Sequence, residues 1–326
     1  MVKEALLRAL EGRTEPLSGE VLSRELGVSR AAVWKAVTTL RSEGYAIEAL
    51  PTRGYRLLEE PDLLRGERLA DPSRVVGCEV VCLDSVDSTN DELKRRAIQG
   101  APTGVAVTAE VQTGGKGRRG RSFQSLAGKG LYLSVLLRPQ VPLEQVSQLT
   151  AWTAIAVCRA VEGLCSAKPS IKWPNDVLVD GKKLCGILTE LGVEAETGAL
   201  SYVVVGMGTN LSQTAADFGP ELADKAVSLA MLGAEVRRAD LARALLGELD
   251  AMNAAFPDGR EGYLAEYRRR CVTLGREIKL VRPQGETVAT ALDVDDDFSL
   301  LVRLPDGTEG RIASGEVSVR GLLGYQ

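Results

Sequence analysis

The residues best suited to do chemistry lie in one short stretch, from Gly114 to Arg121, which holds four glycines and four cations in eight positions. No Asp or Glu occurs between Val111 and Leu143, although the chain as a whole is slightly acidic. Glycine lets the backbone come close to a ligand, and arginine binds carboxylate and phosphate in a fork. The stretch therefore predicts a mobile loop that closes over an anion; a solvated basic turn is the alternative.

Two well-known phosphate-binding loops do not fit this stretch. The glycines at 115, 117 and 120 match a dinucleotide fingerprint, but that motif opens a helix and an acidic residue follows about 20 residues on. Here Arg121 leads into a non-helical segment, and no acid occurs before Glu144. A P-loop is excluded because a glycine, and not Ser or Thr, follows Lys116.

A polar cluster at residues 88–90 lies between an apolar strand predicted at 79–83 and a helix predicted to begin at Asp91. Ser88 and Asp91 have the spacing of a capping box, so a simply capped helix is one interpretation. Capping needs only one such side chain, however, and this cluster has three in a row. The surplus favours a polar ligand at the helix N-terminus.

The segment 171–176 ends a predicted strand with two exposed polar residues, because Pro174 stops the strand. Asp180-Gly181 then predicts a tight hairpin turn, and Lys182 and Lys183 begin the returning strand. Neighbouring side chains on a strand point to opposite faces, so one of the two lysines must face inward. Two solvated lysines beside a turn are the alternative.

Composition limits the class of protein. With 326 residues the chain is long enough for two or three domains, and its net charge of −4 leaves DNA contacts to local patches. The absence of histidine excludes Ser-His-Asp and Cys-His catalysis and histidine-based zinc sites. Six cysteines without a CxxC pair are typical of a reduced, cytoplasmic protein. We expect no membrane partner, because neither a signal peptide nor an apolar run of spanning length is evident.

Residues 1–60 predict a winged helix-turn-helix domain. Ser29 suits the N-cap of a helix ending near Glu43, and apolar residues at 33, 37 and 40 form one buried stripe. Two strand-like pieces then surround a basic tip, as in a wing. Nine cations and nine acids balance here, so only the layout favours DNA binding over protein contacts. The predicted DNA-binding residues are Ser29, Arg30, Lys35, Arg41 and Arg53.

The rest of the chain divides into segments that differ in predicted secondary structure. Residues 61–75 predict a linker, residues 76–272 a catalytic domain of mixed strands and helices, and residues 273–326 a small β domain of short strands and turns. In the catalytic domain a helix is predicted over 147–163, with Trp152 on its core face.

Five motifs, taken in order, resemble those of the biotin–protein ligases that double as the biotin operon repressor. The resemblance extends over nearly the whole chain. The motifs are Asp87-Ser-Thr-Asn, Gly115-Lys-Gly-Arg-Arg-Gly, Lys172-Trp-Pro-Asn-Asp, Lys183-Leu-Cys-Gly-Ile-Leu and Gly206-Met-Gly-Thr-Asn. The resemblance implies an α+β fold with an N-terminal winged helix-turn-helix, a central mixed α/β ligase domain and a C-terminal small SH3-like β-barrel.

The resemblance also implies an ATP-dependent reaction. The carboxylate of biotin would attack the α-phosphate of ATP, giving biotinyl-5′-AMP and pyrophosphate. The biotinyl group would then pass to a lysine of a biotin carboxyl carrier protein or domain. Mg²⁺ would be carried by ATP, near Asn175 and Asp176, with no separate metal site. As a repressor, the protein would form a homodimer that pairs two winged helices across operator DNA.

The family likeness assigns roles to individual residues. The implied catalytic residues are Lys183, Arg118 and Asp176. The implied biotin-binding residues are Ser88, Thr89, Asn90, Gln112, Lys116, Gly117, Arg118 and Lys183. The implied nucleotide-binding residues are Arg118, Arg121, Lys172, Asn175 and Asn210. Lys183 and Arg118 would hold carboxylate and phosphate together without proton transfer, which suits a chain that lacks histidine.

Two positions depart from the family pattern, and three other functions stay open. Lys116 stands where Arg is usual, so we expect a weaker hold on the adenylate. Phe123 stands where Trp is common, which leaves its role in stacking on the base open. The alternatives are a lipoate–protein ligase, a biotin-sensing regulator without catalysis, and a ligase whose winged helix does not repress. The winged helix and the glycine-rich stretch favour biotin over lipoate. Retention of Lys183 and Arg118 favours catalysis.

Overall fold

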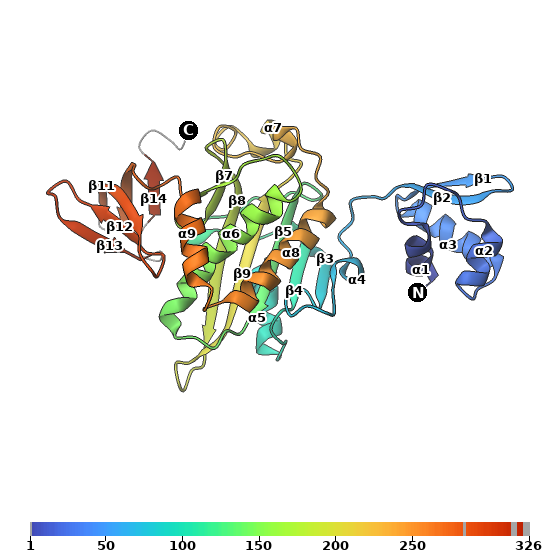
Figure 1. Cartoon of the computed structure of the whole chain (residues 1–326), viewed down its shortest axis with the longest axis horizontal. Coiled ribbons are helices and arrows are strands. Elements are labelled where there is room, and N and C mark those ends of the chain that lie inside the picture. Colours follow the sequence, from blue (N-terminus) through green and yellow to red (C-terminus); the bar gives the residue numbers. More distant parts are fainter. Residues whose placement is uncertain (1, 283–284, 314–317, 322–326) are drawn as a thin grey trace. The chain divides into compact units, whose positions relative to one another are not determined.

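The chain folds into two compact units, Met1–Leu63 and Leu64–Gln326. The computed structural model describes residues 2–282, 285–313 and 318–321. The first unit consists of helices and one hairpin, whereas the second contains a large sheet, helices and a smaller sheet (Figure 1).

The first unit has the layout of a winged helix-turn-helix. Its elements are α1 (Val2–Leu10), α2 (Gly19–Glu25), α3 (Arg30–Ser42), β1 (Ala46–Leu50) and β2 (Gly54–Glu59). The Ser29 hydroxyl accepts a hydrogen bond from the Ala32 N–H and caps α3, as predicted. Val33, Val37 and Leu40 are buried, which confirms the predicted apolar stripe.

The hairpin of the first unit meets the segment before α2 at one close contact. Leu17 and Tyr55 exchange two backbone hydrogen bonds, at 2.9 and 2.8 Å. Gly54 lies at this contact with a φ of 111°, which an L side chain rarely adopts. A Cβ atom on Gly54 would lie 1.9 Å from the Leu17 carbonyl oxygen. The hairpin can therefore reach the helices only through a glycine at this position.

The second unit is built on a seven-stranded mixed sheet in the order β3-β4-β5-β9-β8-β7-β6. Strands β3 and β4 are parallel, and every other neighbouring pair is antiparallel. The strands are β3 (Val80–Val86), β4 (Ala106–Gln112), β5 (Gly130–Leu137), β6 (Ser170–Lys172), β7 (Asp176–Val179), β8 (Lys182–Val193) and β9 (Leu200–Asn210). The predicted turn joins β7 to β8, with φ angles of 49° at Asp180 and 73° at Gly181.

Helices cover both faces of this sheet. Val105 and Val107 pack with Leu93 of α5, whereas the intervening Ala106 belongs to the cluster beneath α6 and α8. Short 3₁₀ segments also occur, at Arg118–Gly120, Leu143–Ser147 and Ala230–Leu232. The helices are α4 (Gly66–Leu69), α5 (Thr89–Ile98), α6 (Gln148–Glu162), α7 (Ala215–Phe218), α8 (Arg238–Ala255) and α9 (Arg260–Arg270). None of the described helices is both long and apolar enough to span a bilayer.

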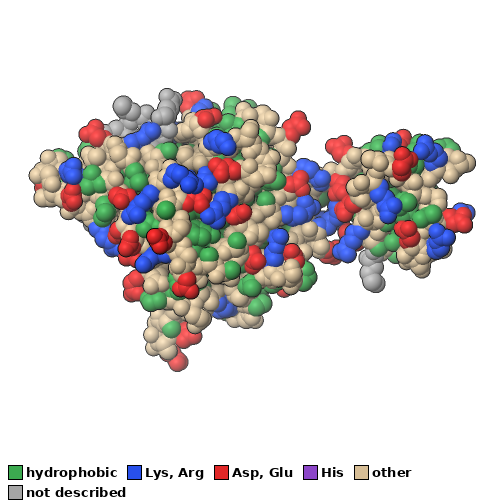
Figure 2. All heavy atoms as spheres, in the orientation of Figure 1, with side chains coloured by type: hydrophobic (Ala, Val, Ile, Leu, Met, Phe, Trp, Pro, Cys, Tyr) green, Lys and Arg blue, Asp and Glu red, His purple; other side chains and the backbone are tan. Residues whose placement is uncertain are grey.

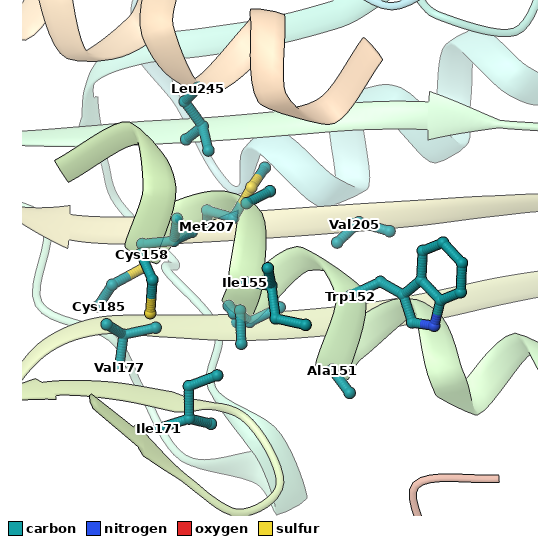
Figure 3. Packing of buried hydrophobic residues seen from close by; sticks show 14 of the residues in the cluster. Ala151, Trp152, Ile155, Cys158, Ile171, Val177, Cys185, Val205, Met207 and Leu245 are labelled. Carbon is teal, nitrogen blue, oxygen red and sulfur yellow. The ribbon is translucent and has the colours of Figure 1, made fainter. Parts of the chain in front are cut away.

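Helix α6 forms the centre of the larger core. Figure 3 shows its Trp152, Ile155 and Cys158 among residues of the sheet strands, including Val205 and Met207 of β9. Trp152 is fully buried, as predicted, and stacks on the Tyr263 ring of α9 with a centroid distance of 3.8 Å. The helix thus fixes the sheet that carries the site described below.

The C-terminal β domain is a five-stranded antiparallel sheet in the order β13-β12-β11-β10-β14, in agreement with the predicted small β domain. Its strands are β10 (Glu277–Arg282), β11 (Gly285–Val294), β12 (Leu300–Arg303), β13 (Glu309–Ile312) and β14 (Ser318–Gly321). The Trp173 indole N–H donates to the Phe298 carbonyl oxygen at 2.9 Å. The Tyr267 and Phe298 rings meet edge to face at 5.5 Å, so this sheet packs against the central domain.

The segment 61–75, predicted to be a linker, contains the short helix α4. Leu64 and Leu69 in this segment are buried in the core of the second unit. Burial of these apolar side chains holds much of the segment to that unit. The three predicted domain boundaries, after residues 60, 75 and 272, stay predictions.

Replacing Gly54 with alanine should destabilise the first unit by about 3 kcal/mol or more, because the new Cβ meets backbone and not a flexible side chain. Gly12 is the matched control, since its φ of 68° is also left-handed but a Cβ there has no neighbour within 4 Å. Gly12→Ala should cost only about 1 kcal/mol.

Differential scanning calorimetry of the full chain measures both variants. The melting transition of the first unit should fall by more than about 10 °C in Gly54→Ala and by much less in Gly12→Ala. Equal shifts in the two variants would show that the contact with Leu17 is unimportant.

Candidate functional site

An open pocket of about 480 Å³ lies on the second unit, where β8 and β9 meet the start of α5 and the glycine loop, residues 114–121. Its lining comes from parts of the chain that are far apart in sequence. The lining residues are Ser88, Thr89, Asn90, Gln112, Lys116, Gly117, Arg118, Phe123, Asn175, Lys183, Gly186, Ile187, Leu188, Gly206, Met207 and Gly208.

Three glycines keep the floor of the pocket flat. Gly186 of β8 pairs with Gly208 of β9, and Gly206 lies two residues along the same strand. A Cβ at Gly208 would lie 2.6 Å from the Phe123 ring, and one at Gly206 would lie 2.1 Å from Asn90 Oδ1. The glycines therefore let an aromatic ring and an amide lie directly on the sheet, as close backbone approach requires.

Hydrogen bonds join the start of α5 to β4 at one wall of the pocket. The Thr89 N–H donates to Gln112 Oε1 at 2.9 Å, and the Thr89 hydroxyl donates to the same oxygen at 3.1 Å. Gln112 Nε2 donates in turn to the Ser125 hydroxyl at 2.8 Å. Because the amide of Gln112 has one orientation in this network, its position in the wall is fixed before any ligand enters.

Asn90 is buried and bonded on both sides of its amide. Its Nδ2 donates to Glu190 Oε2 at 2.9 Å, and its Oδ1 accepts from the Ser134 hydroxyl at 2.6 Å. Both Asn90 and Ser134 are less than 4% exposed. Asn90 thus connects α5 to β5 and β8, and these bonds fix the position of α5 at the wall of the pocket.

The predicted capping box at the start of α5 is absent, and this corrects that interpretation. The Ser88 side chain makes no capping hydrogen bond, and the Ser88 N–H donates to Asp87 Oδ1 and not to Asp91. Asp91 Oδ2 lies 2.6 Å from Lys116 Nζ, and Asp91 Oδ1 lies 2.7 Å from Lys94 Nζ. Burial raises the pKa of Asp91, but the hydrogen bonds from Lys116 and Lys94 outweigh burial and lower the pKa overall.

Arg118 enters the pocket from the glycine loop. Its Nη1 donates to Asn175 Oδ1 at 3.1 Å, and Asn175 Nδ2 donates to the Ile187 carbonyl at 2.9 Å. Burial lowers the pKa of the Arg118 guanidinium, although an arginine stays protonated in such surroundings. The loop therefore places a permanent positive charge beside the floor of the pocket.

Lys183 provides the second cation, and it is the inward-facing member of the predicted lysine pair. Its Nζ lies 2.6 Å from Asp176 Oδ1 across the β7–β8 hairpin. Asn210 Nδ2 donates to the Lys183 carbonyl at 3.3 Å, and the Lys183 N–H donates to the Lys225 carbonyl at 2.8 Å. Both the side chain and the backbone of Lys183 are thus held in place.

The pocket brings together all eight residues predicted to bind biotin. Of the predicted nucleotide-binding residues, Arg118 and Asn175 line it, whereas Arg121, Lys172 and Asn210 do not. Asn210 is 6% exposed, and its amide is used within the protein. The role of each site residue stays a prediction.

The sequence interpretation missed several supporting residues. Ser134 could have been found, because it places a hydroxyl in the middle of the apolar run 131–137. Glu190, and the partnership of Asp91 with Lys116, have no local signal, since each depends on contacts between distant segments. The predicted Mg²⁺ region near Asn175 and Asp176 stays a prediction too, because no metal-binding cluster of three His, Cys, Asp or Glu side chains occurs in the described part of the chain.

No cysteine is among the described residues that line the pocket. Cys185 lies in β8 two residues from Lys183, and burial raises the pKa of its thiol to about 12. A neutral thiol is a poor nucleophile. The functional groups of the lining are therefore cations, hydroxyls and amides.

The predicted DNA-binding residues differ in their surroundings. The Arg41 guanidinium donates twice to the Ile47 carbonyl, at 2.8 and 2.5 Å, and so joins α3 to β1. Arg30 pairs with Glu20 at 2.8 Å, and Arg53 with Glu15 at 3.2 Å, both on the surface. Figure 2 shows both signs of charge mixed over the visible face of this unit.

Three segments of the sequence match known families. Residues 82–210 match the Biotin/lipoate A/B protein ligase family. Residues 2–56 match an HTH domain, and residues 273–320 match the Biotin protein ligase C terminal domain. The middle match includes every residue that lines the pocket.

Known proteins resemble the chain over most of its length. It is 34% identical to the bifunctional ligase/repressor BirA of Bacillus subtilis, a match covering 94% of each chain. It is 35% identical to the biotin–[acetyl-CoA-carboxylase] ligase of Mycobacterium tuberculosis, over 71% of this chain and 85% of that one. A biotin protein ligase from Aquifex aeolicus in complex with biotin and ATP superposes with a TM-score of 0.63 and 29% identity, over 74% of this chain and 98% of that one.

Because its likeness to the bifunctional relatives extends through the helix-turn-helix, the central domain and the C-terminal sheet, the chain belongs to the biotin–protein ligase family, in its bifunctional ligase/repressor branch.

Proposed function

We propose that the protein joins biotin to a carrier protein in two steps and that its winged helix represses transcription. In the first step the biotin carboxylate attacks the α-phosphate of ATP, forming biotinyl-5′-AMP and releasing pyrophosphate. In the second step the amine of an acceptor lysine attacks the biotinyl carbonyl, an amide forms and AMP leaves. The observation that carries this proposal is a pocket with an apolar floor and two held cations, Lys183 and Arg118.

The biotin head occupies the end of the pocket formed by α5 and β4. Its ureido group has both donors and acceptors, which the Ser88 hydroxyl, Thr89 hydroxyl and Gln112 amide complement. Ile187 and Met207 contact the apolar part of the ligand. Lipoate lacks a ureido group, so this polar wall supports biotin as the substrate.

Lys183 and Arg118 serve the reacting centre. A carboxylate and a triphosphate repel each other, and fixed cations allow the two to be held in line for attack. Lys116 adds a third cation at the edge of the pocket. The mixed anhydride hydrolyses in water, so closure of the glycine loop over it protects the intermediate.

ATP enters as its Mg²⁺ complex, with the metal as part of the substrate. Asn175 contacts the nucleotide beside Arg118, and Asp176 lies next to the magnesium-bearing phosphates. Arg121 and Lys172 extend the positive surface from the pocket toward the nucleotide. Asn210 acts indirectly, because its amide holds the backbone of Lys183.

Three partners follow from the proposal. The first is a biotin carboxyl carrier protein or domain, which supplies the acceptor lysine. The second is operator DNA, and the third is a second copy of this chain, since a two-fold dimer places two winged helices on one operator. The winged helix layout and the relatives named as repressors support the DNA-binding role. Because ATP and operator DNA occur together in the bacterial cytoplasm, we place both activities there.

ATP–pyrophosphate exchange tests the first step. With Mg²⁺ and ATP, exchange should appear when biotin is added and stay at background with lipoate or with no acid. Exchange with lipoate would assign the pocket to that acid instead. Failure with both acids would leave a biotin-sensing regulator as the better description.

Lys183→Gln should lower the rate of biotin-dependent exchange roughly 100-fold or more, because it removes the charge that offsets carboxylate–phosphate repulsion. Lys182→Gln is the matched control, since that lysine is adjacent but does not line the pocket. We expect its exchange rate to stay within about twofold of the unmodified protein. Comparable losses in the two variants would contradict a specific role for Lys183.

Asp176→Asn should lower transfer from isolated biotinyl-5′-AMP to the carrier roughly 100-fold, because the asparagine cannot take the proton that the acceptor lysine must lose. Exchange should fall far less, since Lys183 and its positive charge are retained in the pocket. Single-turnover transfer measures this effect. Unchanged transfer together with normal exchange would exclude Asp176 as base.

A further inference from the structure

We propose that Trp34 of α3 reads the operator by packing its indole ring against thymine methyl groups in the major groove. The proposal rests on the operator binding proposed above and names the side chain that supplies part of the sequence specificity. The starting observation is the exposure of Trp34, which is 62% accessible to solvent. The other two tryptophans, Trp152 and Trp173, are at most 1% exposed.

Trp34 lies on an exposed side of α3, off the buried stripe. Val33, Val37 and Leu40 point into the first unit, while Trp34 and Lys35 are exposed. Successive residues of a helix are 100° apart, so exposed residues four apart line one stripe, here Arg30, Trp34 and Thr38. Trp34 is the largest side chain at the centre of this stripe.

The neighbours of Trp34 are less suited to read bases. The Thr38 hydroxyl donates to the Trp34 carbonyl at 3.0 Å, so its hydrogen is used within the helix. Arg41 is held by the Ile47 carbonyl at the far end of α3. Arg30 pairs with the exposed Glu20, an interaction that solvent weakens and a DNA phosphate can replace. Lys35 and Arg30 therefore suit the DNA backbone, and Trp34 is left for the base edges.

The chemistry of the stripe selects a nucleic acid as the occupant. An apolar ring with Arg30 on its own stripe and Lys35 on the adjoining exposed side of the helix matches a groove in which phosphates border the base edges. The thymine methyl is the apolar group that the major groove presents, and contact with it separates A·T pairs from the others. The first unit has balanced charge overall, so specificity must come from such contacts more than from bulk attraction.

The experiment begins with a duplex chosen by the protein itself. Full-length protein with biotin, ATP and Mg²⁺ selects its sequence from random DNA duplexes, and that duplex is the probe. Acrylamide quenching then follows tryptophan fluorescence, and Trp34 dominates the quenchable signal because the other two tryptophans are buried. We expect the selected duplex to suppress quenching and an unselected duplex to suppress it less at equal salt.

Removal of single methyl groups tests the contact without altering the protein. Each thymine of the selected duplex is replaced by uracil, which lacks the 5-methyl group. We expect at least one position where the replacement weakens binding of the unmodified protein but leaves binding of Trp34→Ala unchanged. Trp34→Ala itself should lower affinity for the unmodified duplex about tenfold or more.

Leu58→Ala is the matched control, since Leu58 is 58% exposed in the same unit, at the end of β2 away from the hairpin turn. Its affinity should match that of the unmodified protein, and circular dichroism checks that both variants are folded. Selection of a duplex whose binding leaves Trp34 fully quenchable, or is insensitive to Trp34→Ala or to every uracil, would overturn the inference while operator binding stands. If the protein selects no sequence, both proposals fail.

Discussion

The ion pair between Lys183 and Asp176 is the interaction on which the pocket depends. It places an ammonium group and a carboxylate 2.6 Å apart in a chain without histidine, and the pair forms only if the backbone holds both residues in position. The Asp180-Gly181 turn pairs Leu178 with Lys183, and an irregularity between Val177 and Leu178 then shifts the register on the way to Asp176. The Asn210 side chain holds the Lys183 carbonyl by a hydrogen bond. The pairing of Gly186 in β8 with Gly208 in β9 leaves the floor of the pocket open beneath the Lys183 ammonium group.

Much of this arrangement could be predicted from the sequence, because the signals are local. A hairpin turn, an N-cap and a buried helical stripe each depend on residues within about ten positions of one another. The polar residues at strand ends converged on one pocket for a similar reason, since neighbouring strands of a sheet end near one another. The alternation of side chains along a strand likewise indicated that either Lys182 or Lys183 faces inward.

Other features could not be predicted, because they are contacts between distant segments. Asp91 has the spacing of a cap, yet it binds Lys116, which lies in a loop whose position depends on the whole sheet. Arg41 lies off the buried stripe and stays a predicted DNA contact, but the hydrogen bonds that its guanidinium donates to the Ile47 carbonyl depend on how the chain returns after α3, which the sequence of the helix does not indicate. The exposure of Trp34, in contrast, follows from the sequence, because the apolar stripe at 33, 37 and 40 leaves position 34 outside the buried face of the helix.

The glycine loop also has a link to the C-terminal sheet. Arg119 adopts a left-handed conformation with a φ of 59°, and its Nη1 donates to the Val281 carbonyl of β10 at 3.2 Å. A loop that is anchored at its middle samples fewer conformations than a loop fixed only at its ends. It therefore loses less conformational entropy when it closes over a ligand. The contact with the C-terminal sheet therefore raises the affinity of the pocket by lowering the entropy cost of ordering the loop. Because such coupling is reciprocal, a ligand that orders the loop also stabilises the contact between the loop and the C-terminal sheet.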